Sequence, residues 1–319
     1  MASPEYGMTD AGGPNTSKIL VRGQPIGQIL MLHSAWLQNK GGRRADLSGA
    51  TLNSADLQKA DLRQAVMVGA SLLEANLTSA DLSGADLRDS DLRKATLYRV
   101  DLNGADLTMA NLQNCWLAES NLSEARMEHV RLCSSILRDC RMLEAKMYRC
   151  DFSGAIMNGA LFNHSSALEC SFVDADLEKA CFLRARIQSA RFTGARLERA
   201  VFNDALIEGC DFRGTNGDSA SFDSANLSQS TFSQSIYSNC SFASANLDGA
   251  DFSYTVLSGS GFDEANLTMT NLRGAVLEGS RHLTANQLTV ARTSSGTILP
   301  NGMRGPYVRG LGFERPVRH

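Results

Sequence analysis

Residues 45–64 of this 319-residue chain read ADLSG-ATLNS-ADLQK-ADLRQ, which is four five-residue units in succession. Each unit begins with a small residue and has leucine in third place. The frame continues without a break, because every fifth residue from Leu47 to Leu277 is Leu, Ile, Met, Phe or Tyr, except Ala167 and Gly217. Only 43% of the residues are hydrophobic, so a frame of this length cannot arise by chance and indicates one continuous repeat array.

A repeat of five residues fits neither the 3.6-residue period of a helix nor the two-residue period of a strand. The pattern requires a chain that turns a corner every five residues, so that the small first residue and the large third residue of each unit face inward. Four such sides make a square coil of 20 residues, and stacked coils satisfy one another's backbone groups at strand spacing. The sequence therefore predicts an all-β solenoid of about twelve four-sided coils.

The Ala-Asp/Asn-Leu-x-x units, such as those at 45–49 and 80–84, resemble the pentapeptide-repeat family. The resemblance covers about 235 of the 319 residues. It implies a right-handed quadrilateral β-helix and a bacterial source. It implies little about function, because one solenoid architecture serves many unrelated roles.

From residue 152 onward, phenylalanine alternates with other large residues at the inward position. A spacing of ten places the phenylalanines on two opposite sides of the square, and a spacing of 20 stacks them within each side. One expected core ladder contains Phe152, Phe172, Phe192, Phe212, Phe232 and Phe252. The facing core ladder contains Phe162, Phe182, Phe202, Phe222, Phe242 and Phe262. Ladders of this kind let rings and smaller aliphatic groups share one narrow interior.

Two inward positions are too small for this frame. Ala167 and Gly217 each leave a coil underfilled, unless Leu168 turns inward at the first site and residues 215–218 bulge outward at the second. The sequence therefore predicts local departures from regular geometry at 164–169 and at 215–219.

Both ends of the array need caps, because an open coil edge would recruit another chain. Residues 26–39 have apolar side chains at helical spacing, Pro25 precedes them and a glycine pair follows. The residues on this stripe are Ile26, Ile29, Leu30, His33, Trp36 and Leu37. At the other end, residues 284–287 read TANQ, a capping box that predicts a short helix over 285–292.

These signals divide the chain into four parts. They are a flexible segment at 1–17, a capping-helix region at 18–43, the repeat β-helix at 44–281, and a second capping helix with an irregular tail at 282–319. No run of 18 apolar residues exists, so no membrane span is expected. Glu5 and Asp10 precede any apolar stretch, which argues against a signal peptide. Cysteines that are expected to stay free thiols favour a cytoplasmic protein.

The residues that usually carry catalysis are placed for packing. Six of the eight cysteines occupy the small inward position, where cysteine behaves as a slightly larger alanine. They are Cys115, Cys140, Cys150, Cys170, Cys210 and Cys240. Cys150 and Cys170 lie within bridging distance, but free thiols are expected. His33 lies on the apolar stripe of the first helix, and no phosphate loop, nucleophile elbow or HExxH motif occurs. We therefore expect no enzyme, cofactor, metal or small-molecule substrate.

One outward row is acidic, since Asp61, Asp81 and Asp101 precede the large residue on successive coils. One interpretation is that these aspartates brace the corner, as the family consensus implies. The other is that spaced carboxylates imitate DNA phosphates, because the resemblance extends to pentapeptide-repeat proteins that bind DNA gyrase as duplex mimics and protect it from inhibitors.

Charge along the array is uneven. Residues 45–115 carry ten acidic and six basic residues, a net charge of −4. Residues 116–210 carry thirteen acidic and twelve basic residues, a net charge of −1, and residues 211–280 carry eight acidic and two basic residues, a net charge of −6. Bases on all four sides interrupt the acidic surface in the middle stretch, namely Arg126, Arg131, Arg141, Lys146, Arg186, Arg191 and Arg196. A mimic needs a long acidic stripe and a nucleic-acid site needs one basic track. We therefore expect no direct nucleic-acid binding.

Other outward rows are unexpectedly apolar. The candidate protein-interface residues are Trp116, Ile136, Ile156, Leu161, Val201, Ile236, Val256 and Val276. Family units usually have Asp, Asn, Ser or Thr at this position. Exposed apolar strips usually mark a surface that binds a partner or that another segment of the chain covers. The alternative is that the tail at 293–319, with Tyr307, Leu311 and Phe313, folds back over these rows.

Two functions remain open. One is a rigid, non-enzymatic scaffold that binds a protein partner or itself, as a structural part or accessory of a larger assembly such as a phage particle or an injection apparatus. The alternative is a DNA mimic that binds DNA gyrase or another topoisomerase. The uninterrupted frame favours the scaffold, because the resemblance implies that gyrase-protecting relatives often carry loops within their coils and a C-terminal dimer module.

Overall fold

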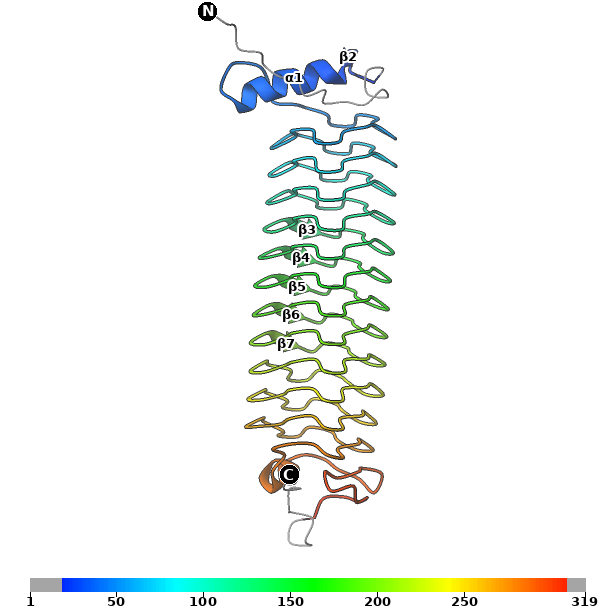
Figure 1. Cartoon of the computed structure of the whole chain (residues 1–319), viewed down its shortest axis with the longest axis vertical. Helices are drawn as coiled ribbons and strands as arrows, with labels where there is room; N and C mark the ends of the chain where they lie inside the picture. Colours follow the sequence, from blue (N-terminus) through cyan, green and yellow to red (C-terminus); the bar gives the residue numbers. More distant parts are fainter. Residues whose placement is uncertain (1–18, 309–319) are drawn as a thin grey trace, which may run out of the picture.

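The computed structural model describes residues 19–308, so the segment at 1–17 and the last part of the predicted C-terminal tail lie outside the described residues. The repeats stack into a long rod with one helix at each end (Figure 1). The predicted four-sided solenoid is confirmed, because residue n pairs in parallel with residue n+20. This register runs from the bridge between Asp46 and Val66 to the bridge between Gly261 and Arg281.

A hairpin and a helix precede the first coil. β1 (Leu20–Val21) pairs antiparallel with β2 (Gln24–Pro25), and α1 (Ile26–Leu37) follows directly. In the middle of the rod one side forms a five-stranded parallel sheet. Its strands, in order, are β3 (Arg126–Glu128), β4 (Lys146–Tyr148), β5 (Ser166–Leu168), β6 (Arg186–Gln188) and β7 (Leu206–Glu208). α2 (Ala285–Val290) follows the last repeat.

The same backbone hydrogen bonds recur in most units, as the first coil illustrates. The Leu47 N–H donates to the Val66 carbonyl on the next coil (2.7 Å), and the Val66 N–H donates back to the Ala45 carbonyl (2.9 Å). A bond from the Ala50 N–H to the Leu47 carbonyl (3.0 Å) closes the corner. The last residue of the unit turns the chain with a positive φ, which is 64° at Gly49 and suits a residue without a side chain. Adjacent coils therefore satisfy each other's backbone groups.

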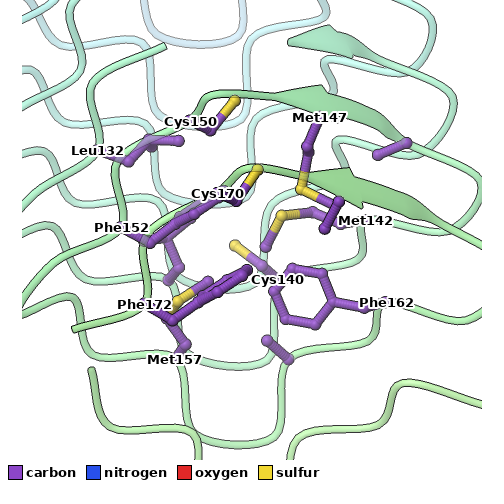
Figure 2. Packing of buried hydrophobic residues seen from close by; sticks show 14 of the residues in the cluster. Leu132, Cys140, Met142, Met147, Cys150, Phe152, Met157, Phe162, Cys170 and Phe172 are labelled. Atoms are coloured by element: carbon purple, nitrogen blue, oxygen red, sulfur yellow. The ribbon is translucent and has the colours of Figure 1, made fainter. Parts of the chain in front are cut away.

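The inward phenylalanines stand in two stacks. Rings one coil apart are parallel, as for Phe152 and Phe172, whose centroids are 5.0 Å apart with 1° between the planes. Rings of opposite stacks meet edge to face, as for Phe162 and Phe172 at 6.1 Å and 88°. Figure 2 shows both arrangements around Phe172. Aromatic rings favour both geometries, so the two stacks fill the middle of the coil as one interlocked unit.

The predicted departure at 164–169 is wrong. β5 pairs with both neighbouring strands in the regular register, and Ala167 faces inward and is buried. Leu168 stays outside and is 36% exposed. Figure 2 shows the Met147 side chain turned along the rod axis, toward the coil that carries Phe162 and Cys170. A long, flexible methionine can fill such space, so the backbone does not have to move.

The predicted bulge at 215–219 is also wrong. The Gly217 N–H keeps its regular bond to the Ile236 carbonyl (2.8 Å). The ring of Tyr237, on the next coil, occupies the space where a side chain of residue 217 would lie, and a Cβ there would collide with it. The Tyr237 hydroxyl lies 2.8 Å from Thr215 Oγ1, so its polar end is satisfied inside the core. The missing side chain is thus replaced from the neighbouring coil.

Both caps are present. α1 buries Ile26, Leu30 and His33 against the first coil, and the Ala45 N–H donates to His33 Nδ1 (3.1 Å). α2 begins with the predicted capping box, in which the Gln287 N–H donates to Thr284 Oγ1 (3.3 Å) and the Thr284 N–H to Gln287 Oε1 (2.8 Å). Within residues 19–308 neither helix is long and apolar enough to cross a membrane.

The chain after α2 continues the stack, whereas the sequence predicted an irregular tail from this point. Arg292 pairs with Asn271, and Ile298 pairs with Val276, so the register extends past the predicted end of the array at 281. Leu299 is buried. The described part of the tail therefore lies on the end of the rod and does not run back along its sides.

Candidate protein interface

The register brings three of the predicted interface residues together. Bridges join Thr96 to Trp116, Trp116 to Ile136, and Ile136 to Ile156, so these residues follow one another on successive coils of one side. Trp116 is 46% exposed, and the two isoleucines are half-buried. We call Trp116, Ile136 and Ile156 the tryptophan row.

Tyr98 extends this row toward the N-terminal end. Its ring stacks on Trp116 with centroids 5.1 Å apart and 23° between the planes. The Arg99 guanidinium lies 4.9 Å from the centre of the Tyr98 ring. Glu119 holds both residues, because it accepts from the Tyr98 hydroxyl (2.9 Å) and from Arg99 Nε (2.8 Å). We call Tyr98 and Trp116 the aromatic platform.

The charges around the platform support each other. The hydrogen bond to Glu119 raises the pKa of the Tyr98 hydroxyl, so this group stays a proton donor. The hydrogen bond from Arg99 is the main cause that lowers the pKa of Glu119, so the carboxylate stays ionised. The platform is therefore held in one orientation over the ordinary pH range before any partner arrives.

Sequence reasoning missed Tyr98, although a signal existed. Tyr98 follows a large inward residue, and Trp116, 18 residues later, precedes one on the next coil. The same spacing recurs in polar contacts, such as that between Ser153 and Ser171 (2.9 Å) and that between Glu198 and Asn216 (2.8 Å). A search at n+18 as well as n+20 would have paired the two rings.

A polar cluster separates the tryptophan row from the apolar residues farther along the same side. Arg196 donates to Asp176 (3.0 Å) and lies 3.5 Å from Glu198. Beyond this cluster come Ile236, Val256 and Val276, and Ile298 continues them by pairing with Val276. The eight predicted interface residues therefore do not form one surface.

Leu161 and Val201 lie on the adjoining side. Cys181 pairs with both of them, and all three are half-buried. The same row begins with Asp61, Asp81 and Asp101 at its N-terminal end, which links the predicted acidic row and this apolar segment in one line. Three separate apolar segments result, and only the tryptophan row has an ordered aromatic platform beside it.

The acidic row is regular, but its carboxylates are engaged. Arg63 makes a bidentate contact with Asp61 (2.8 and 2.7 Å) and lies 3.6 Å from Asp81. Asp81 also accepts from the Ser83 N–H (3.0 Å), and Asp101 from the Asn103 N–H (2.9 Å). The hydrogen bond from Arg63 is the main cause that lowers the pKa of Asp61. These contacts are those of residues that brace a corner.

The inward cysteines are buried thiols. All eight cysteines are free. Burial raises the pKa of Cys115 and of Cys140 to about 12, which keeps both protonated and unreactive. Among residues 19–308, no group of three or more His, Cys, Asp or Glu side chains is placed to hold a metal ion.

A model of the pentapeptide repeats matches six overlapping segments that together span 45–163, and a separate segment at 240–279. A model of the pentapeptide repeat region matches residues 145–222. No curated protein sequence matches the chain.

Several solved structures are similar. HetL, involved in heterocyst differentiation regulation in the cyanobacterium Nostoc sp. strain PCC 7120, is 24% identical over 67% of this chain and 91% of its own, with a TM-score of 0.28. The plasmid-mediated fluoroquinolone resistance protein QnrB1 is 19% identical over 55% of this chain and 92% of its own, with a TM-score of 0.20. Rfr23 from the cyanobacterium Cyanothece 51142 is 28% identical over 32% of this chain and 62% of its own, with a TM-score of 0.15. With its frame, its 20-residue register and these family matches, the chain belongs to the pentapeptide repeat family.

Proposed function

We propose that this chain is a rigid, non-enzymatic scaffold that binds a protein partner through the aromatic platform and the tryptophan row. The observation that carries the proposal is the fixed stack of Tyr98 on Trp116, with Arg99 beside it. Trp, Tyr and Arg are the residues that most often dominate the binding energy of protein interfaces. A side chain that is already ordered loses little conformational entropy on binding.

The neighbouring isoleucines complete the surface. Ile136 and Ile156 continue the row by about 5 Å per coil, the strand spacing, so the platform and the row form a narrow apolar strip along the rod. A strip on a rod suits a partner that lies alongside it, which is the geometry of a structural part or accessory in a larger assembly. A second copy of this chain is one such partner.

The experiment locates the partner and then measures its affinity. A photo-crosslinking residue at position 136 is expected to capture a partner from extracts of the native cells, and the same residue at Tyr254, an exposed aromatic elsewhere, is not. With purified partner, Trp116→Ala is expected to weaken binding by tenfold or more, since such hot spots are worth about 2 kcal/mol or more. Tyr254→Ala serves as the matched control. Equal affinities of Trp116→Ala and the unchanged chain would contradict the proposal.

The topoisomerase alternative makes a different prediction. A duplex mimic needs a row of free carboxylates, and the pairing of Asp61 with Arg63 and the bracing roles of Asp81 and Asp101 weigh against one here. We expect no protection in DNA supercoiling by purified gyrase, with or without quinolone, even at high excess of this chain. Protection at low micromolar concentration would replace the scaffold proposal with the mimic.

A further inference from the structure

The N-terminal cap differs in charge from the repeats, as does the C-terminal end, where residues 281–308 contain three arginines and no acidic residue. Residues 19–44 contain four basic residues, Arg22, Lys40, Arg43 and Arg44, and no acidic residue. The repeats at 45–280 carry the opposite balance, since their three stretches have net charges of −4, −1 and −6. The cap is therefore a cationic end on an anionic rod.

A cleft of about 350 Å³ lies between the β1–β2 hairpin, α1 and the first coil. Arg22, Arg43 and Arg44 contribute to one part of its lining. Val21, Ile29 and Leu32 contribute an apolar part, and Gln24 and Asp46 complete the lining. The volume is at the lower end of the range for ligand pockets.

Two of the three guanidinium groups are fixed by the first coil. Arg22 donates to Asp46 (2.7 Å). The pKa of the Asp46 carboxyl is lowered to about 2, chiefly by its hydrogen bond with Ser48 and in addition by the hydrogen bond from Arg22. Arg44 Nε donates to the Gln64 carbonyl. The single carboxylate of the cleft is thus already neutralised, and two positive charges remain.

Arg43 is the free guanidinium of the cleft, since its side chain makes no hydrogen bond or ion pair within residues 19–308. The backbone places it there, because the Arg43 N–H donates to the Leu32 carbonyl at 3.1 Å and so ties the returning chain to α1. Gly42, with φ 82°, permits this approach, and a Cβ at this residue would collide with the Leu32 carbonyl and approach the Trp36 nitrogen to 2.9 Å. Arg43 is therefore available to pair with a ligand.

Exposed apolar side chains lie next to residues that line the cleft. α1 contains no charged residue, and Met31 on its outer face is 64% exposed. Leu20 of β1 is 61% exposed. An uncharged helix with an exposed methionine on its outer face offers an apolar contact to another chain.

We propose that this cleft binds an acidic peptide segment of another protein, with carboxylates on the arginines and an apolar side chain against Ile29 and Leu32. Guanidinium groups pair with carboxylates through two parallel hydrogen bonds, which favours this chemistry. Inorganic phosphate would leave the apolar lining without a contact. A lipid surface is flat, whereas the arginines line a concave site. The cleft is remote in sequence from the tryptophan row and does not depend on it.

The test is a selection of random ten-residue peptides displayed against the full chain. Enriched peptides are expected to combine acidic and apolar residues, and Arg43→Glu is expected to weaken a selected peptide tenfold or more, with a strong dependence on salt. Arg138→Glu is the matched control, because Arg138 is also exposed and its replacement by glutamate changes the net charge by the same amount. The melting temperature of Arg43→Glu is expected to match that of the unchanged chain, since the Arg43 side chain makes no hydrogen bond or ion pair in the described part of the chain.

Several outcomes would overturn this proposal. They are enrichment of peptides without acidic residues, equal weakening by the Arg43 and Arg138 variants, and binding to phosphatidylserine vesicles or phosphate in place of peptides. If a peptide bound only to the variant with Glu5→Gln and Asp10→Asn, the acidic N-terminal segment of the chain itself would be the occupant of the cleft. Trp116→Ala is expected to leave peptide binding unchanged, so failure of this proposal and failure of the scaffold proposal are distinguishable.

Discussion

The large side chain of Tyr237 fills the space that Gly217 leaves empty on the adjacent coil. The five-residue frame identifies residue 217 as too small, and the tyrosine 20 residues later is the only one at an inward position. Both halves of the compensation are therefore visible in the sequence. What the frame does not contain is the direction of a side chain along the rod axis, and that direction decides whether a void, a bulge or a regular coil results. The same reasoning applies to Met147 beside Ala167.

Placing leucine, the common inward residue, at position 217 alone or at position 237 alone is expected to destabilise the rod. Gly217→Leu collides with the Tyr237 ring, and overpacking of this kind costs about 1–3 kcal/mol. Tyr237→Leu leaves a void and the Thr215 hydroxyl without its partner. The double variant returns two leucines to the column and is expected to recover most of the loss. A double-mutant cycle in urea measures this coupling, and additive effects would contradict the compensation.

Phe202 tests the stacked core at a position with complete neighbours. Its ring lies between Phe182 (4.7 Å) and Phe222 (4.9 Å) and is fully buried. Phe202→Ala is expected to cost about 3–5 kcal/mol of unfolding free energy, as for other buried aromatics. Val201→Ala, next to it on the outer surface, is the control and is expected to cost much less. A loss below about 1 kcal/mol at Phe202 would show that the rings do not carry the core.

The repeat elements were predictable because one period governs both the backbone and the interior. The same pairing between coils repeats along the array, so the register of 20 follows from the count of five and places every outward row. The capping box also predicted where α2 begins. Contacts between side chains of neighbouring coils were not predictable from the register alone. Tyr98 reaches diagonally to Trp116 on the next coil, and Arg63 folds back onto Asp61 in its own unit.

The N-terminal cap is expected to loosen in mild acid. His33 is buried, and burial is the main cause that lowers its pKa below 6.5. The backbone of Arg63 and the Asp61 carboxylate oppose this shift, and the charges of Arg44 and Arg63 add to it. Its Nδ1 accepts from the Ala45 N–H and must be unprotonated to do so. A detached cap therefore binds a proton more readily than a closed one, and cap stability is full above pH 6.5 and falls as the pH drops toward the folded-state pKa.

Hydrogen exchange of the α1 amides between pH 7.5 and 5, expressed as protection factors, measures this effect. The expected loss approaches tenfold per pH unit at most. His33→Gln keeps an acceptor near Ala45 without a titrating ring, so its protection is expected to be flat over the same range. Parallel pH profiles for the two chains would mean that another group controls the cap.

On the scale of the whole rod, each coil contacts only the coils before and after it. The free energy of unfolding is then close to the sum of the stabilities of the single coils and of the contacts between adjacent coils, as in other solenoids. The ends hold one neighbour each, which explains why the two helices are needed there. The interior also changes along the rod, from leucine in the N-terminal half to stacked phenylalanine after residue 152. Larger buried rings bring more apolar area per coil.

This arrangement predicts that damage in one coil stays local. Native-state hydrogen exchange on Phe202→Ala is expected to show lost protection in the coils that contain Phe182, Phe202 and Phe222, whose rings stack directly. The amides around Leu57 and Leu77, far from the substitution, are expected to exchange at the rates of the unchanged chain, because no contact transmits the loss along the rod. A uniform loss of protection from one end to the other would mean that the solenoid unfolds as a single cooperative unit, and that its coils are coupled more strongly than nearest-neighbour contacts allow.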